Sequence, residues 1–165
     1  VDGCTTVCFG LPLRAMALAY ARFGVRGEPA AVRVRNAMLA HPHLVGGTGR
    51  LCTDLMRETA GRVLAKIGAE GVYSAAWPEL GLGLTLKVED GDMRSAQVAL
   101  LGVLAQLDAE FGAQLPLGRG SGLVDLVCRS TQGVIVFNTA DDERVVSVER
   151  LSEDGGDGGD EGEAE

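Results

Sequence analysis

The stretch LCTDLMRETAGRVLAKIGAEGVYSAAWPELGLGLTLKVED, residues 51–90, decides the fold of this chain. Its beginning has a helical pattern that ends at Gly61, since glycine is favoured just after a helix. Three strand-like runs follow, at 63–66, 72–77 and 82–88. Glycine-containing residues at 68–71 and the bend residue Pro78 separate these runs. The stretch therefore predicts a helix followed by an antiparallel meander of three strands.

Further helical patterns occur before this stretch in the sequence, at 11–24 and 29–40, and after it, at 92–111. The last is the longest, with Asp92 as a suitable N-cap and apolar residues at helical spacing along one face. We expect that face to cover the sheet, because a meander needs cover on one side. Two further strand-like runs occur at 134–137 and 144–148. The predicted fold class is α+β, with helices packed on an antiparallel sheet.

Composition indicates one globular domain, residues 1–151, and an acidic tail, residues 152–165. The net charge of the chain is −8, and the tail holds seven acidic residues and no basic one, which leaves the domain at about −1. We expect the tail to be disordered, because it has almost no apolar surface to bury. The nearly neutral domain favours neither nucleic acid nor an anionic membrane as a partner.

Four cysteines are too few and too scattered for a disulfide framework, and no apolar run approaches the roughly 18 residues of a membrane span. We therefore expect reduced thiols and a cytoplasmic location. The chain starts with Val1 and enters Asp2-Gly3-Cys4 at once, so we also expect that it begins within a domain.

Lys66 is the strongest candidate for a functional side chain. It interrupts an otherwise apolar strand, and Gly68 follows two residues later. A functional lysine would project into a cleft while Gly68 leaves the strand edge open to a substrate. The alternative is an edge lysine whose stem covers apolar surface and whose charge reaches water. Arg50 also has two interpretations, an electrostatic role or a cap on the neighbouring helix.

Metal binding has weaker local support. His41 and His43 flank Pro42, which favours a loop that ends a helix over a metal site. Cys4 and Cys8 lie four residues apart, and Asp2 could share a divalent ion with Cys4. A tetrahedral zinc site would still need a third and a fourth ligand.

Several long motifs, taken together, resemble the rhizobial-type L-asparaginases, also called asparaginase II. They are DGC at 2–4, AMLAHPHLVGGTGRLCTDLM at 37–56, KIGAEGVYSAAWPELGLGLTLKVEDGD at 66–92, and the closing VFN and VVSVERL. The likeness covers most of residues 1–150 and corresponds to the C-terminal half of that family. It implies a partial fold of the serine β-lactamase and penicillin-binding type, in which Lys66-Ile67-Gly68 occupies the place of a K-T-G strand.

The resemblance also implies a function and roles for individual residues. The family hydrolyses L-asparagine to aspartate and ammonia, so a small-molecule substrate is expected, and a homodimer is left open. By resemblance, Lys66 and Asp2 are catalytic, Cys4 binds zinc, and Cys52 is a thiol near the site. Gly68 and Arg50 are the substrate-binding candidates.

The family's nucleophilic Ser-x-x-Lys pair and its further zinc ligands, in a Cys-x-x-Lys pair, lie in an N-terminal half that has no counterpart here. No Ser-x-x-Lys occurs in the 165 residues. The leading hypothesis is thus a truncated and inactive part of an asparaginase. A non-catalytic binding domain derived from one, or an unrelated small α/β protein, are the alternatives.

Overall fold

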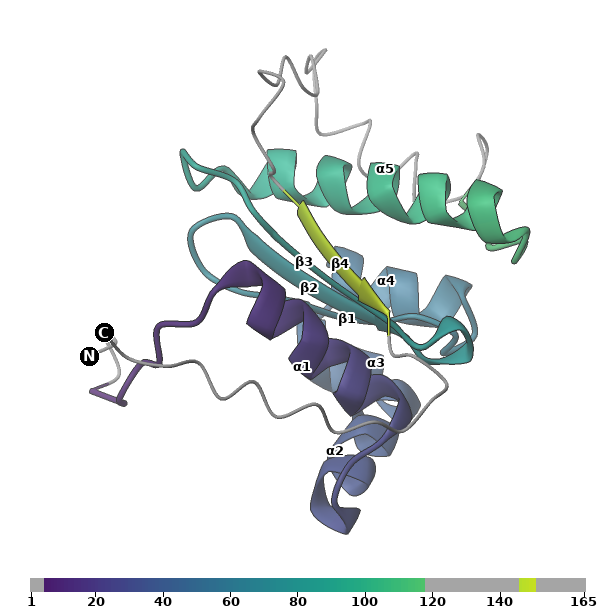
Figure 1. Cartoon of the computed structure of the whole chain (residues 1–165), viewed down its shortest axis with the longest axis horizontal. Helices are drawn as coiled ribbons and strands as arrows, with labels where there is room; N and C mark the ends of the chain where they lie inside the picture. The colour runs from purple at the N-terminus through teal and green to yellow at the C-terminus, as the bar shows by residue number, and fades with distance from the viewer. Residues whose placement is uncertain (1–4, 118–145, 151–165) are drawn as a thin grey trace, which may run out of the picture.

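The computed structural model describes residues 5–117 together with the backbone of residues 146–150 (Figure 1). The helices are α1 (Leu13–Val25), α2 (Pro29–Ala40), α3 (Pro42–Gly46), α4 (Leu51–Glu58) and α5 (Met93–Phe111), with a 3-10 turn η1 (Pro78–Leu80). The strands are β1 (Leu64–Ile67), β2 (Val72–Trp77), β3 (Leu82–Lys87) and β4 (Val146–Arg150). Asp2, Cys4, the predicted strand at 134–137 and the tail 152–165 lie outside the described residues.

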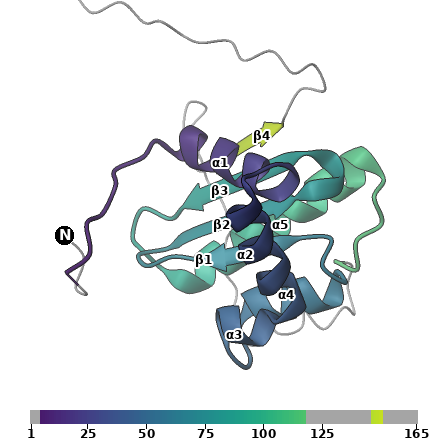
Figure 2. The same cartoon turned by 90° about the horizontal axis from the view of Figure 1, so that it is seen from below.

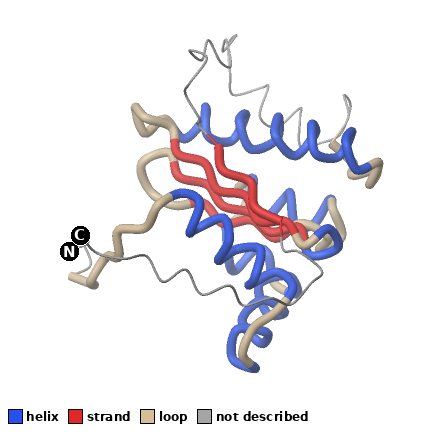
Figure 3. Tube along the Cα trace, in the orientation of Figure 1, coloured by secondary structure: helices blue, strands red, loops and turns tan. Residues whose placement is uncertain are grey.

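The four strands form an antiparallel sheet in the order β1-β2-β3-β4 (Figure 3). The predicted α+β class and the meander of β1, β2 and β3 are confirmed. The turn after β1 is closed by a hydrogen bond from the Gly68 amide to the Val72 carbonyl, with Gly71 at a positive φ of 70°. Gly81 likewise has a positive φ of 63° before β3, which glycine adopts at little cost. These turns set the register of the sheet.

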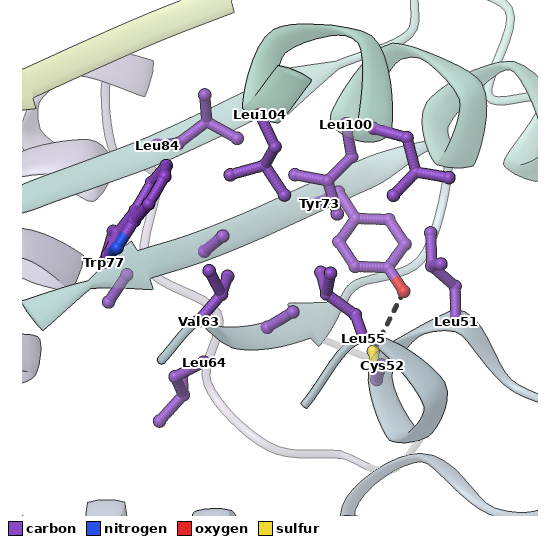
Figure 4. Close-up of a cluster of buried hydrophobic side chains, with 14 of the residues drawn as sticks. Leu51, Cys52, Leu55, Val63, Leu64, Tyr73, Trp77, Leu84, Leu100 and Leu104 are labelled. Carbon is purple, nitrogen blue, oxygen red and sulfur yellow. Dashed lines mark hydrogen bonds between the residues drawn. The ribbon is translucent and has the colours of Figure 1, made fainter. Parts of the chain in front are cut away.

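One face of the sheet is apolar and is covered by α4 and α5. Figure 4 shows leucines of both helices packed around Tyr73, Trp77 and Leu84 of the strands. The expected cover by the 92–111 helix is therefore confirmed. Asp92 caps α5 by accepting a hydrogen bond from the Ser95 amide at 2.8 Å, because the first amides of a helix lack internal partners.

The other face carries α1 and is lined by small residues. A Cβ added to Gly83 would clash with the Ala17 carbonyl oxygen and the Ala21 amide nitrogen. Farther along the helix, an added Cβ on Gly24 would lie 3.0 Å from Cβ of Ala76. Small residues in these strands thus let α1 approach the sheet backbone closely.

The helices before residue 42 differ from expectation in two details. The helical pattern 11–24 ends at Gly24, which we expect to stop the helix, but α1 continues to Val25 and buries Gly24. The pattern also offers the apolar side chains of 29–40 for burial, but none of the residues of α2 is fully buried, and Val34 is 53% exposed. Met38 and Leu39 are partly buried and pack against the core. Helix α2 contacts the rest of the described domain mainly through α1, α3 and β1. The helical period of the sequence therefore overestimated how much of α2 is buried in the core.

Seen from below, α3 and α4 lie beside β1, the strand at one edge of the described sheet (Figure 2). Across the described ranges, no helix has the length and apolar character needed to cross a membrane.

Candidate functional site

Lys66 lies on β1, an edge strand of the described sheet. Gly68 is hydrogen-bonded to Val72, and bonded pairs alternate along an antiparallel ladder, so Ala65 and Ile67 turn their backbone groups away from β2. The Lys66 ammonium folds over this edge and donates to the Ile67 carbonyl oxygen at 2.6 Å. The half-buried side chain lies as an edge lysine is expected to lie, and it places a positive charge at the β1 edge of the described sheet.

A row of polar side chains crosses the face of the sheet that carries α1. Lys66 lies opposite Ser74 on β2, and Ser74 lies opposite Thr85 on β3. The two hydroxyl oxygens are 3.0 Å apart and both side chains are buried. The Ser74 hydroxyl also lies 3.5 Å from the sulfur of Met16 on α1. Lys66 is thus the charged outer member of a row whose inner members are hydrogen-bonded.

Tyr20 of α1 approaches the same row. Burial raises the pKa of its hydroxyl, the nearby Cys52 adds to the increase, and a hydrogen bond with Ser74 opposes it. The phenol therefore stays protonated at neutral pH and can donate a hydrogen bond within the row.

Cys52 and Tyr73 form a buried pair on the opposite face of the sheet (Figure 4). The Cys52 sulfur lies 3.0 Å from the Tyr73 hydroxyl oxygen. Burial raises the pKa of Tyr73 far above its ordinary value, and the neighbouring thiol adds to the increase. Tyr73 is the cross-strand partner of Ile67, so this pair lies under the same end of β1 as Lys66.

Arg50 directly precedes α4 and is exposed. Its side chain makes no capping hydrogen bond, so the structure does not support the capping role that the sequence left open. Although burial dominates and raises the pKa of Tyr73, the positive charge of Arg50 acts in the opposite direction. Arg50 therefore lies within electrostatic reach of the Cys52–Tyr73 pair.

Gly68 begins the turn between β1 and β2 and is exposed. A Cβ at this position would lie 3.2 Å from Cβ of Val72, which is a tight contact. The turn itself thus favours a glycine here, and contact of Gly68 with a substrate stays a prediction.

The structure brings Lys66, Arg50 and Cys52 to one end of β1, on the two faces of the sheet. It does not relate them to Asp2 or Cys4, which lie outside the described residues. Sequence reasoning missed Tyr73 and Ser74. Period-two alternation puts Ser74 and Lys66 on the same face only once the register is known, and the turn at 68–71 sets that register.

A zinc site cannot be assembled from the residues that the structure describes. No group of three His, Cys, Asp or Glu side chains in this part of the chain is arranged to hold a metal ion. Cys8 is exposed, and its thiol lies near the carbonyl of Thr6. The described residues therefore do not fit zinc by themselves, and no chemical step is assigned to it.

An open depression of about 830 Å³ lies between α2, α3 and α4. His41, His43 and Arg57 are its polar lining residues, and Leu44, which is 82% exposed, forms part of its apolar wall. None of the predicted site residues lines it. It is therefore separate from the site at β1.

Comparison with known proteins bears on this site, since the two longest motifs contain Arg50, Cys52, Lys66 and Gly68. The family described as L-asparaginase II matches residues 1–118, more than two thirds of the chain. The chain belongs to the L-asparaginase II family. The match includes every predicted site residue, those outside the described ranges among them. No curated protein matches the chain.

Proposed function

We propose that this chain carries part of an active site that hydrolyses the side-chain amide of L-asparagine. Membership of the L-asparaginase II family over residues 1–118 is the observation that carries the proposal. The arrangement at β1 supports it, because Lys66 places a positive charge at the edge of the described sheet, and Arg50, on the other face, acts on Tyr73 near the same end of β1. An amino-acid substrate offers a carboxylate to such charges.

Amide hydrolysis needs a nucleophile, donors for the developing oxyanion and an acid for the departing ammonia. Lys66 would supply positive charge, either to the substrate carboxylate or within the proton relay. Its ammonium has three donor hydrogens, and the Ile67 carbonyl accepts one of them. The other two can turn toward a substrate without leaving the backbone partner.

The attacking group is the missing part. The chain contains no Ser-x-x-Lys, the pair that the family resemblance leads us to expect as the nucleophile. We therefore propose that the 165-residue chain is inactive alone and corresponds to the C-terminal portion of a β-lactamase-like domain. Asp2 and Cys4 keep their proposed roles as a catalytic residue and a zinc ligand.

A second candidate function follows from the same absence. A chain with the substrate-binding residues and no nucleophile could bind asparagine as a non-catalytic domain. Lys66 would then hold the substrate carboxylate, and its bond to the Ile67 carbonyl shows that the charge is already held at the edge.

Ammonia release from asparagine, with glutamine as the control substrate, tests the proposal. The 165-residue chain should release none, and a chain extended by a family N-terminal half with Ser-x-x-Lys should release it. Asparagine binding to the extended chain without turnover would favour the binding function. Robust activity of the 165-residue chain alone would contradict the proposed missing nucleophile.

A further inference from the structure

The C-terminal end of α1 carries a concentration of positive charge. Residues 13–40 contain five arginines and one glutamate, a net charge of +4. Arg22 and Arg26 are exposed, and within the described ranges neither forms an ion pair. Arg35 of α2 adds a third guanidinium here, because it donates to the carbonyls of Phe23 and Gly24 at 3.0 and 2.7 Å. We call Arg22, Arg26 and Arg35 the basic end of α1.

The backbone of β4 brings the chain to this end of the helix. Arg150, the last described residue, lies opposite Leu82 at the start of β3. Gly24 packs on Ala76, which is the cross-strand partner of Gly83, the neighbour of Leu82. The last turn of α1 and the end of β4 therefore lie at the same end of the sheet.

Helix geometry also turns Arg22 toward the β4 side. Tyr20 points to Ser74 on β2, and Arg22 follows two residues later, about 200° farther round the helix. Because α1 rests on β3 through Ala17 and Ala21 and Tyr20 lies toward β2, Arg22 is on the other, exposed flank of the helix, nearer β4 than β2. Arg26 directly follows α1 as its C-cap residue, with an extended backbone, so it adds a second exposed guanidinium at the end of the helix.

The segment that follows β4 has the complementary charge. Residues 152–165 contain seven acidic side chains and no basic one. Fourteen extended residues span up to about 45 Å, whereas a helix the length of α1 spans about 20 Å. The tail is tethered beside the basic end of α1 and is long enough to reach all of it.

We propose that the acidic segment 152–165 docks on the basic end of α1 within the same chain. The contact is electrostatic and needs no fixed tail conformation. Tethering supplies an effective concentration in the millimolar range, so weak contacts suffice. The tail then competes with any other anion for Arg22 and Arg26. The proposal is independent of the catalytic assignment, because it concerns binding alone.

The test compares the full chain with a tail-neutralised full chain, in which all seven acids of 152–165 are replaced by their amides. Backbone and arginine side-chain signals of residues 22–26 and Arg35 are recorded by nuclear magnetic resonance. We expect these signals to differ between the two chains at about 0.01 M salt and to coincide at about 1 M, where screening acts over about 3 Å instead of about 30 Å.

Charge reversal provides the matched controls. In a chain with Arg22→Glu and Arg26→Glu, neutralising the tail should no longer move the Arg35 signal. Arg57→Glu reverses an exposed charge on α4 and should leave the effect intact. If the double reversal prevents folding, Arg22→Gln with Arg26→Gln should reduce the effect by at least about half.

Binding in trans gives a second measurement. A peptide of residues 152–165 should bind the tail-neutralised chain, and its affinity should fall at least about tenfold between 0.01 and 0.2 M salt. Signals that do not change on tail neutralisation, or changes that persist at 1 M salt, would overturn the proposal. Changes that grow with protein concentration would assign the tail to a second copy and also overturn it.

Discussion

The sulfur of Cys52 lies 3.0 Å from the hydroxyl oxygen of Tyr73, and both side chains are buried. The pair joins the first turn of α4 to the apolar face of the sheet, near the end of β1 that carries Lys66. A buried polar group left without its partner costs about 1–3 kcal/mol. This pair therefore links the stability of the domain to the candidate site.

Tyr73→Phe should lower the free energy of unfolding by about 1–3 kcal/mol, because the Cys52 thiol loses its partner. Chemical denaturation measures the loss. Cys52→Ala combined with Tyr73→Phe should cost less than the sum of the two single changes, since each single change already breaks the same bond. Strict additivity would mean that the 3.0 Å contact contributes nothing.

Stability should fall as the pH rises above about 10, the ordinary pKa of an unfolded tyrosine. Burial raises the folded pKa of both tyrosines, Tyr20 and Tyr73, so the unfolded chain loses protons that the folded chain keeps. Each such group lowers stability by about 1.4 kcal/mol per pH unit in this range. Denaturation at pH 9–11 measures the slope, and Tyr73→Phe should reduce it. An unchanged slope in that variant would contradict the burial of Tyr73.

Gly83→Ala should destabilise the domain by at least about 1–3 kcal/mol, because its Cβ would clash with the backbone of α1. Gly102→Ala is the matched control, since nothing lies within 4 Å of a Cβ there and alanine favours a helix by about 1 kcal/mol. Thermal unfolding of the two variants should therefore move in opposite directions. Equal shifts would show that α1 does not pack on Gly83.

Leu104→Ala should cost about 2–5 kcal/mol, as expected when a buried leucine is truncated. Leu104 is 2% exposed and faces the sheet between α5 and the strands (Figure 4). Urea denaturation measures the loss, and Ala105→Ser on the exposed side of α5 should change stability by less than about half a kcal/mol. A loss that small for Leu104→Ala would mean that α5 does not cover this face.

Much of the fold follows from local rules. The turn residues at 68–71 and the Asp92 cap are strong local signals, and they allow β1–β3 and α5 to be predicted from the sequence. The extension of α1 through Gly24 could not be predicted in this way. Arg35 and Ala76 contact the last turn of α1 only in the tertiary fold. The partial exposure of α2 is a tertiary property too, since periodicity does not show that only Met38 and Leu39, near its end, pack against the core while Val34 stays exposed.

The candidate site was predicted less completely. An unusual residue type in an apolar strand identifies Lys66, and family motifs bring in Arg50 and Cys52. The contacts around them depend on register and on helix packing, so neither the Ser74–Thr85 row nor the partner of Cys52 follows from spacing. The roles of Asp2 and Cys4 stay predictions from the resemblance.

The contribution of Lys66 to asparagine hydrolysis is the most direct test of this account. The assay is ammonia release by the chain extended with the family's N-terminal half. Lys66→Ala should lower turnover about a hundredfold or more, because a charge that stabilises the transition state contributes several kcal/mol. Lys87→Ala is the matched control, since Lys87 is the other lysine of the chain and likewise donates to the carbonyl of the next residue, Val88. Lys87→Ala should retain full turnover, and equal turnover of the two variants would contradict a catalytic role for Lys66.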